Sequence, residues 1–134
     1  MLRIIGEFDP ERLVRRVGWE AEAEWWQKSD PGRTGRPFNC SGIQILVSDA
    51  QFDDLTGQVA HAVEFLAEEE ESLRLLMSEP GVREGVLDFG VAQHAQPAYS
   101  RRFPARLIEL AGRVGLGIEV SHYAVSGVGG FAER

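Results

Sequence analysis

The stretch IQILVSDAQFDDLTGQVAHAVEFL, residues 43–66, decides the fold, because its hydrophobic spacing changes halfway along. Ile43, Ile45 and Val47 alternate with other residues, which is the spacing of a β-strand that has one buried face. Apolar residues then recur every three or four positions, at Phe52, Leu55, Val59, Val63 and Leu66. This second spacing places them on one stripe of an amphipathic helix. The chain is therefore predicted to pass from a strand into a long helix that covers the same sheet.

The ends of this helical region carry their own signals. Ser48 and Gln51 have the spacing of a capping box, in which each side chain bonds a backbone N–H in the first turn. We therefore expect the helix to begin just after Ser48. Four consecutive acids at residues 68–71 predict a solvent-facing segment and a break, followed by a second short helix that Pro80-Gly81 ends.

The same two spacings predict the remaining elements. An apolar run at residues 2–6 predicts a strand, and Asp9-Pro10 then begins a short helix that ends at Gly18. Further strands are predicted at residues 21–27, 86–93 and 118–124. Phe103-Pro104 leads into a helix that ends at Gly115. A loop is predicted at residues 28–37, where two prolines, two glycines and no apolar side chain occur.

The resulting order is β-α-β-β-α-β-α-β, which begins as a ferredoxin-like unit and adds a helix and a strand. We predict an α+β fold with a single sheet of four or five strands and helices mainly on one face. Residues 1–125 are expected to form one domain. The glycine-rich residues 126–134 are expected to form a flexible tail.

Composition narrows the classes of partner. Among 134 residues, 14 Lys and Arg stand against 21 Asp and Glu, so the formal charge is −7. Such a charge repels a phosphate backbone, which argues against nucleic acid, and it attracts a basic protein. Cys40 is the only cysteine, so no internal disulfide forms. With no signal-peptide pattern at the start and no apolar run of about 18 residues, we expect a cytoplasmic protein without a membrane partner.

Several segments resemble an uncharacterised bacterial family of domains of unknown function, described as DUF4279-like. The similarity lies in Asp9-Pro10, Val17-Gly18-Trp19, the Trp26 to Gly35 region and the C-terminal LGIEVSHYAV. Two positions depart from the family pattern: Ser29-Asp30 replaces a usual glycine, and Ser121-His122-Tyr123 replaces a more acidic ending. The resemblance covers nearly the whole chain and implies fold and length. It implies no activity and no site residue.

Motifs for metal, nucleophilic and phosphate chemistry are missing from the sequence. Neither HExxH nor CxxC occurs, and the histidines at 61, 94 and 122 are far apart, so we expect no metal site and no cofactor. Cys40 has no flanking signature of a catalytic cysteine. Neither a GxSxG elbow nor a GxxxxGK[ST] phosphate loop is present. An enzyme is therefore the less favoured class.

One set of polar residues remains as a candidate site. Asp88 and Glu119 fall on the less apolar faces of two predicted strands, where a carboxylate pair can act as acid and base, with Gln44 nearby. Solvent-facing acids on an open sheet explain the same pattern more simply. His94, Tyr123 and Trp26 complete the candidate face, because Tyr and Trp dominate protein recognition surfaces.

Three hypotheses follow. The preferred one is a non-catalytic protein-binding domain, with an immunity-type inhibitor of a basic toxin as a subtype suggested by analogy. The second is a small-molecule-binding domain or minor enzyme that uses Gln44, Asp88, Glu119 and His94. The third is a structural homodimer that pairs through the predicted strand containing Trp25 and Trp26.

Overall fold

The structure, a computed structural model, describes residues 1–93 and 100–124. It contains five strands: β1 (Leu2–Gly6), β2 (Ala23–Trp26), β3 (Ser41–Ile45), β4 (Val82–Gln93) and β5 (Gly117–Ala124). It contains four helices: α1 (Pro10–Val17), α2 (Leu55–Glu68), α3 (Glu70–Ser78) and α4 (Ala105–Arg113). The predicted sequence of elements is confirmed. The predicted tail at residues 126–134 lies outside the described part of the chain.

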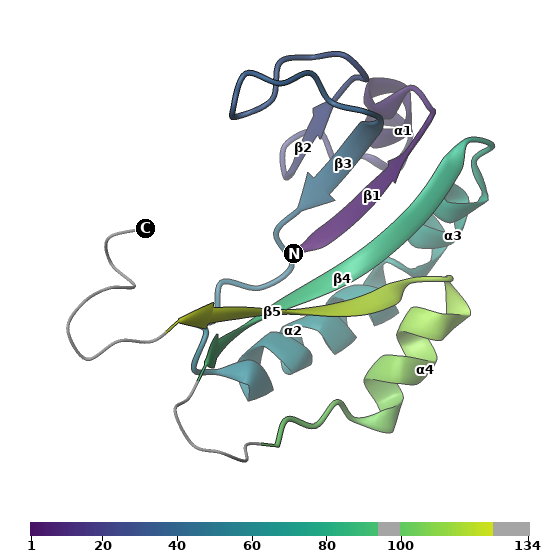
Figure 1. Cartoon of the computed structure of the whole chain (residues 1–134). Helices are drawn as coiled ribbons and strands as arrows, with labels where there is room; N and C mark the ends of the chain where they lie inside the picture. The colour runs from purple at the N-terminus through teal and green to yellow at the C-terminus, as the bar shows by residue number, and fades with distance from the viewer. Residues whose placement is uncertain (94–99, 125–134) are drawn as a thin grey trace.

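All five strands form one mixed sheet in the order β2-β3-β1-β4-β5. β3 lies antiparallel between β1 and β2, and β4 lies antiparallel on the other side of β1. This is the split β-α-β arrangement of the predicted ferredoxin-like core. β5 then adds to β4 in parallel through the crossover helix α4, as Figure 1 shows at the yellow end of the chain. The α+β class with a single sheet is confirmed.

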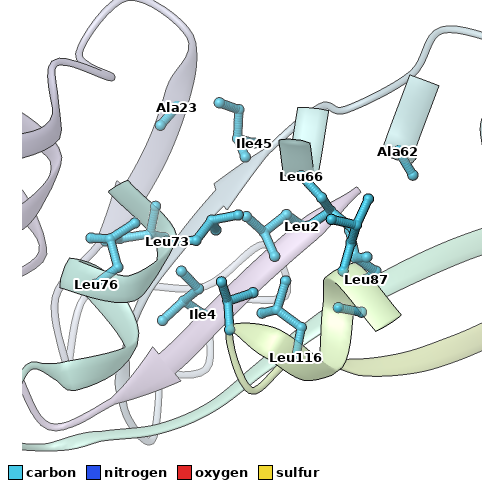
Figure 2. Close-up of a cluster of buried hydrophobic side chains, with 14 of the residues drawn as sticks. Leu2, Ile4, Ala23, Ile45, Ala62, Leu66, Leu73, Leu76, Leu87 and Leu116 are labelled. Atoms are coloured by element: carbon cyan, nitrogen blue, oxygen red, sulfur yellow. The ribbon is translucent and has the colours of Figure 1, made fainter. Parts of the chain in front are cut away.

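The helices pack on one face of the sheet. Leu2 on β1 lies opposite Ile45 and Leu87, and the three side chains are buried on that face. Figure 2 shows them meeting leucines from the helices in a continuous apolar cluster. The largest fully buried side chains include Leu2, Ile4, Leu13, Ile43, Leu66, Leu73, Leu76, Leu87 and Leu107. Burial of this cluster is the main driving force that joins helices to sheet.

Local signals set the ends of α1 as the sequence predicts. Asp9 accepts a hydrogen bond from the backbone N–H of Arg12, and Pro10 occupies the first helical position. Gly18 ends the helix with a φ of 77°, in the left-handed region that glycine adopts without strain. α1 therefore stops in time for Trp19 to enter the core.

The predicted start of α2 is wrong. The helix begins at Leu55, and Asp54 caps it by accepting a hydrogen bond from the backbone N–H of Gly57. Ser48 accepts instead from the backbone N–H of Ala50, within an extended segment that precedes the helix. The capping-box pattern failed because this segment must first cross to β4, where the carbonyl of Phe52 accepts from the N–H of Ala92.

The acidic run at residues 68–71 does mark a break, between α2 and α3. Its interpretation as a purely solvated segment is wrong. Glu69 Oε1 accepts a hydrogen bond of 2.6 Å from the indole of Trp19, and Glu70 pairs with Arg74 and Arg113. The run thus connects the start of α3 to Trp19, just after α1, and to α4. None of the helices in the described residues is long and apolar enough to cross a membrane.

Candidate functional site

The face of the sheet opposite the helices is the candidate site, and we call it the open face. Side chains alternate along each strand, so the register of neighbouring strands fixes its members. Those members are Arg3, Ile5, Glu24, Trp26, Gly42, Gln44, Glu84, Val86, Asp88, Gly90, Ala92, Gly117, Glu119, Ser121 and Tyr123. Five of the six predicted site residues belong to it: Trp26, Gln44, Asp88, Glu119 and Tyr123.

The structure brings Asp88 and Glu119 together as direct partners in the β4–β5 register. Asp88 Oδ1 accepts a hydrogen bond of 2.7 Å from the hydroxyl of Ser121. Glu119 Oε2 accepts one of 3.1 Å from the guanidinium of Arg3, and both of these side chains are partly exposed. Each carboxylate therefore already has a hydrogen-bond donor within the fold.

Gln44 does not join this pair. It lies on β3, opposite Arg3, so the whole width of β1 separates it from Asp88 on β4. Arg3 occupies the position between them that the sequence analysis left empty. His94 lies outside the described residues. The predicted polar residues are thus spread across the sheet and do not converge on one point.

The open face is acidic. Its side chains include four carboxylates, those of Glu24, Glu84, Asp88 and Glu119. Arg3 lies among them, and the exposed Arg83 adjoins Glu84 at the bulge where β4 shifts register against β1, so the formal charge of these six side chains is −2. Glu24 and Glu84 are exposed and form no ion pair with described residues. Part of the chain's acidic charge is therefore concentrated where no helix covers the sheet.

Aromatic rings lie at both ends of the open face. Trp26 lies over Gly42 and stacks on Phe38 with a centroid distance of 5.0 Å. At the other end Phe52 stacks on Tyr123 at 4.3 Å, close above Gly90. Each pair lies over a glycine, because the absence of a side chain leaves room for a ring on the sheet. Phe52 and Tyr123 are more than a third exposed.

Phe52 is a member of this surface that its sequence spacing does not reveal. Its spacing matches the helical stripe of α2, so it was assigned to the core. The signal that could have found it is Gly90, a glycine in the middle of a strand, which often marks a close approach by another group.

A Ser–His pair is a second feature that the sequence does not reveal. Ser48 Oγ and His61 Nδ1 are 2.6 Å apart, beside Asp49 at the start of the crossing segment. A histidine that accepts a serine proton is the first requirement of nucleophilic catalysis. Within residues 1–93 and 100–124, no carboxylate contacts the other ring nitrogen of His61. The pair connects the crossing segment to α2 and lacks the third group of a triad.

A hollow of about 430 Å³ opens at the start of α2. Asp53, Asp54 and Thr56 at the start of α2 line it together with Arg101 and Arg102, which precede α4. Its size is within the range of small-molecule sites. Its lining combines both signs of charge with the apolar side chains of Phe52, Leu55 and Val59.

Metal-ligating residues do not converge in the part of the chain that the structure describes: no three side chains of His, Cys, Asp or Glu are placed to hold an ion. The Cys40 thiol is free and half-buried. The site is therefore a broad acidic sheet surface with a separate hollow beside it.

The fold and this surface define an acidic α+β protein with an extended ferredoxin-like core. No family model, no curated protein and no solved structure matches the chain. The resemblance to the DUF4279-like family stays a prediction.

Proposed function

We propose that this protein is a non-catalytic protein-binding domain whose open face binds a basic surface of another protein. The observation that supports the proposal most directly is the formal charge of −2 on a sheet face that none of the described helices covers. An immunity-type inhibitor that neutralises a basic toxin is the subtype that this charge favours. That subtype rests on analogy with small acidic α+β inhibitors.

The arrangement of the open face suits such a partner. Like charges that are spread over a sheet raise the rate of encounter with an oppositely charged protein. The exposed carboxylates of Glu24 and Glu84 are available to pair with lysine or arginine. The stacked rings of Phe52 and Tyr123 supply apolar area of the kind that carries binding energy at interfaces.

The chemistry of the carboxylates favours binding over catalysis. Asp88 is held by Ser121, and Glu119 is held by Arg3. A general acid or base must reach the reacting group with a hydrogen bond, and these two carboxylates are instead bonded to their neighbours in the sheet. The same hydrogen bonds fix both side chains in position, which lowers the entropy cost of binding.

Affinity capture from the native host with two matched double variants tests the proposal. In the first, Glu24→Lys with Glu84→Lys reverses two charges on the open face. In the second, Glu64→Lys with Glu68→Lys makes the same charge change on the exposed side of α2. We expect the parent chain and the α2 variant to capture the same basic protein in equal molar amount. We expect the open-face variant to bind it roughly tenfold or more weakly.

Salt adds a second readout. Because exposed charges are screened over about 8 Å at physiological ionic strength, raising the salt should weaken the complex. The proposal is wrong if no stoichiometric basic protein is captured, or if the open-face variant holds its partner as tightly as the α2 variant does.

The hollow at the start of α2 favours a second candidate function, the binding of a small molecule. It replaces the spread-out residues Gln44, Asp88 and Glu119 as the place for this alternative, because a ligand needs convergent groups. Because two arginines and two aspartates are among its lining residues, the hollow suits a ligand that carries both signs of charge, such as a zwitterion.

Thermal unfolding with a panel of free amino acids tests this second function. We expect at least one amino acid to raise the unfolding midpoint of the parent. The variant Thr56→Trp fills the hollow from an exposed position and should abolish the rise. Equal shifts in parent and variant, or no shift in either, would eliminate the candidate.

A further inference from the structure

The charged residues of the hollow at the start of α2 differ in whether the fold itself uses them. Asp54 caps α2, because its carboxylate accepts a hydrogen bond from the backbone N–H of Gly57. The guanidinium of Arg101 donates to the backbone carbonyl of Ala92, near the end of β4. Each of these two side chains therefore has a structural role, one at the helix end and one at the strand end.

One charge of each sign in the hollow is left unpaired. Asp53 and Arg102 both line it, and both residues are exposed. Within residues 1–93 and 100–124, neither side chain forms a hydrogen bond or an ion pair, and the two do not pair with each other. A negative and a positive group that line the same hollow without meeting leave space for a ligand that binds both.

Much of the remaining lining is apolar. Phe52, Leu55 and Val59 contribute to it. Val59 is 8% exposed and belongs to the hydrophobic core, so the hollow opens onto the edge of that core. The ring of Phe52 is stacked on Tyr123 at 4.3 Å, which holds this part of the lining in place. A ligand in the hollow therefore meets an apolar surface as well as two opposite charges.

We propose that the hollow binds a free α-amino acid with a large apolar side chain. This inference rests on the second candidate function proposed above, and it assigns the chemical class of the ligand. Arg102 binds the α-carboxylate, and Asp53 binds the α-ammonium group. The side chain of the ligand packs on Phe52, Leu55 and Val59. An α-amino acid matches this lining because one carbon atom carries both charges and the side chain.

The charge balance of the hollow favours an uncharged ligand side chain. Its two arginines and two aspartates sum to zero, and an apolar α-amino acid is also neutral at pH 7. A further carboxylate or ammonium group on the ligand would lie against apolar side chains without a partner, which costs free energy. The volume of about 430 Å³ is within the range of sites for small ligands.

The end of a peptide chain shares only part of this chemistry. A peptide N-terminus has the ammonium group but carries an amide in place of the α-carboxylate, and a C-terminus has the reverse. Either end would pair with one of Asp53 and Arg102 and leave the other charge in the hollow unpaired. The presence of both charges therefore favours the free amino acid.

Titration calorimetry of the full chain with L-leucine, L-phenylalanine and two analogues of each tests the proposal. The amide analogue lacks the carboxylate and stands for a peptide N-terminus. The N-acetyl analogue lacks the ammonium group and stands for a C-terminus. We expect each analogue to bind roughly tenfold more weakly than its amino acid, because it loses a hydrogen bond to a charged group. L-glutamate and L-lysine should also bind more weakly.

Two substitutions assign the two charges. Arg102→Gln should weaken leucine binding roughly tenfold and leave leucinamide unchanged, so that this variant no longer distinguishes the two ligands. Asp53→Asn should in the same way remove the difference between leucine and N-acetyl-leucine. A merely structural role would weaken all these ligands alike. Arg16→Gln and Asp49→Asn are the matched controls, because both residues are exposed and lie outside the hollow, and they should bind as the parent does.

The outcomes separate this inference from the proposed functions. Glutamate or lysine binding as tightly as leucine would overturn the inference and leave the small-molecule function standing. The same holds if the analogues bind as tightly as the amino acids, or if the Arg102 and Asp53 variants, folded by circular dichroism, keep the discrimination of the parent. If no amino acid binds to the parent, the inference and the small-molecule function are both wrong. Capture of a basic protein is measured separately and does not depend on this result.

Discussion

Replacement of Gln58 by leucine is the most direct test of how the edge of β4 is completed. β4 extends past the last residue that pairs with β1. There the side-chain amide of Gln58 takes the place of a neighbouring strand and pairs with the backbone of Gly90. Its Nε2 donates to the carbonyl of Gly90 at 2.7 Å, and its Oε1 accepts from the N–H of Gly90 at 3.2 Å. Nε2 also donates to the carbonyl of Gln51 at 3.0 Å. Gln58 is 7% exposed, so water cannot easily replace these bonds.

The expected magnitude follows from these three hydrogen bonds. Each contributes about 1 kcal/mol, and a backbone group left buried without a partner costs about 1–3 kcal/mol. The carbonyl of Gln51 belongs to an exposed residue and can bind water. We therefore expect Gln58→Leu to lower the free energy of unfolding by about 2–4 kcal/mol, mostly through Gly90. For a chain of this length the midpoint of thermal unfolding should fall by roughly 10 °C.

Urea denaturation and amide hydrogen exchange at Gly90 provide the assay. The urea midpoint should fall without a change of slope, and exchange at Gly90 should accelerate more than exchange in β1. Gln51→Ala is the control. Gln51 contributes only its backbone carbonyl to the hydrogen bond, so this variant should be as stable as the parent. A loss below about 0.5 kcal/mol for Gln58→Leu would refute the reasoning, since that is the size of an ordinary surface substitution.

Two further predictions concern the helix layer and the open face. Hydrogen bonds from Arg74 and then Arg113 lower the pKa of Glu70 from its ordinary value of 4.5, so the charged form stabilises the fold. Glu70→Gln should therefore lower the urea midpoint at pH 7, and the difference from the parent should vanish as the pH falls through the lowered pKa. Gly42→Val should displace the ring of Trp26, change the near-ultraviolet circular dichroism and cost about 1–3 kcal/mol in the free energy of unfolding. Gly112→Ala is the control, because it adds a methyl group in open space and should change neither the circular dichroism nor the free energy of unfolding. An unchanged near-ultraviolet signal in Gly42→Val would contradict the packing of Trp26 on Gly42.

The hydrophobic spacing predicted the elements because each is an amphipathic segment whose period is local. Leu87, Phe89 and Val91 alternate in the sequence and are buried on one side of β4 in the structure. Leu107 and Leu110 recur at helical spacing and are buried under α4. The start of α2 was mispredicted because the hydroxyl of Ser48 has more than one local use. In the folded chain this hydroxyl accepts from the N–H of Ala50, because the segment after Ser48 runs in extended form to β4 before the helix begins.

The face of the sheet on which the predicted polar residues lie could be read from the sequence, but their arrangement on it could not. Alternation alone places Gln44, Asp88 and Glu119 on the less apolar side of their strands. The order of strands in the sheet depends on contacts between distant parts of the chain. This order places Asp88 beside Glu119, and it places Arg3 between Asp88 and Gln44. The ring of Phe52 was assigned to the core because its spacing is that of a helix, although its place on the open face depends on Gly90, some forty residues later.

The sequence by itself determined the α+β class, the order of strands and helices, the acidic charge and the missing catalytic motifs. These depend on composition and on periods of a few residues, which a chain carries whatever its partners are. Only the tertiary structure decided the strand order β2-β3-β1-β4-β5, the ion pair of Arg3 with Glu119 and the place of β5 at the end of the described sheet. Each of these joins residues that are distant in the chain. They are decided by which arrangement buries the apolar faces of sheet and helices together, and the open face is the side that this burial leaves to solvent.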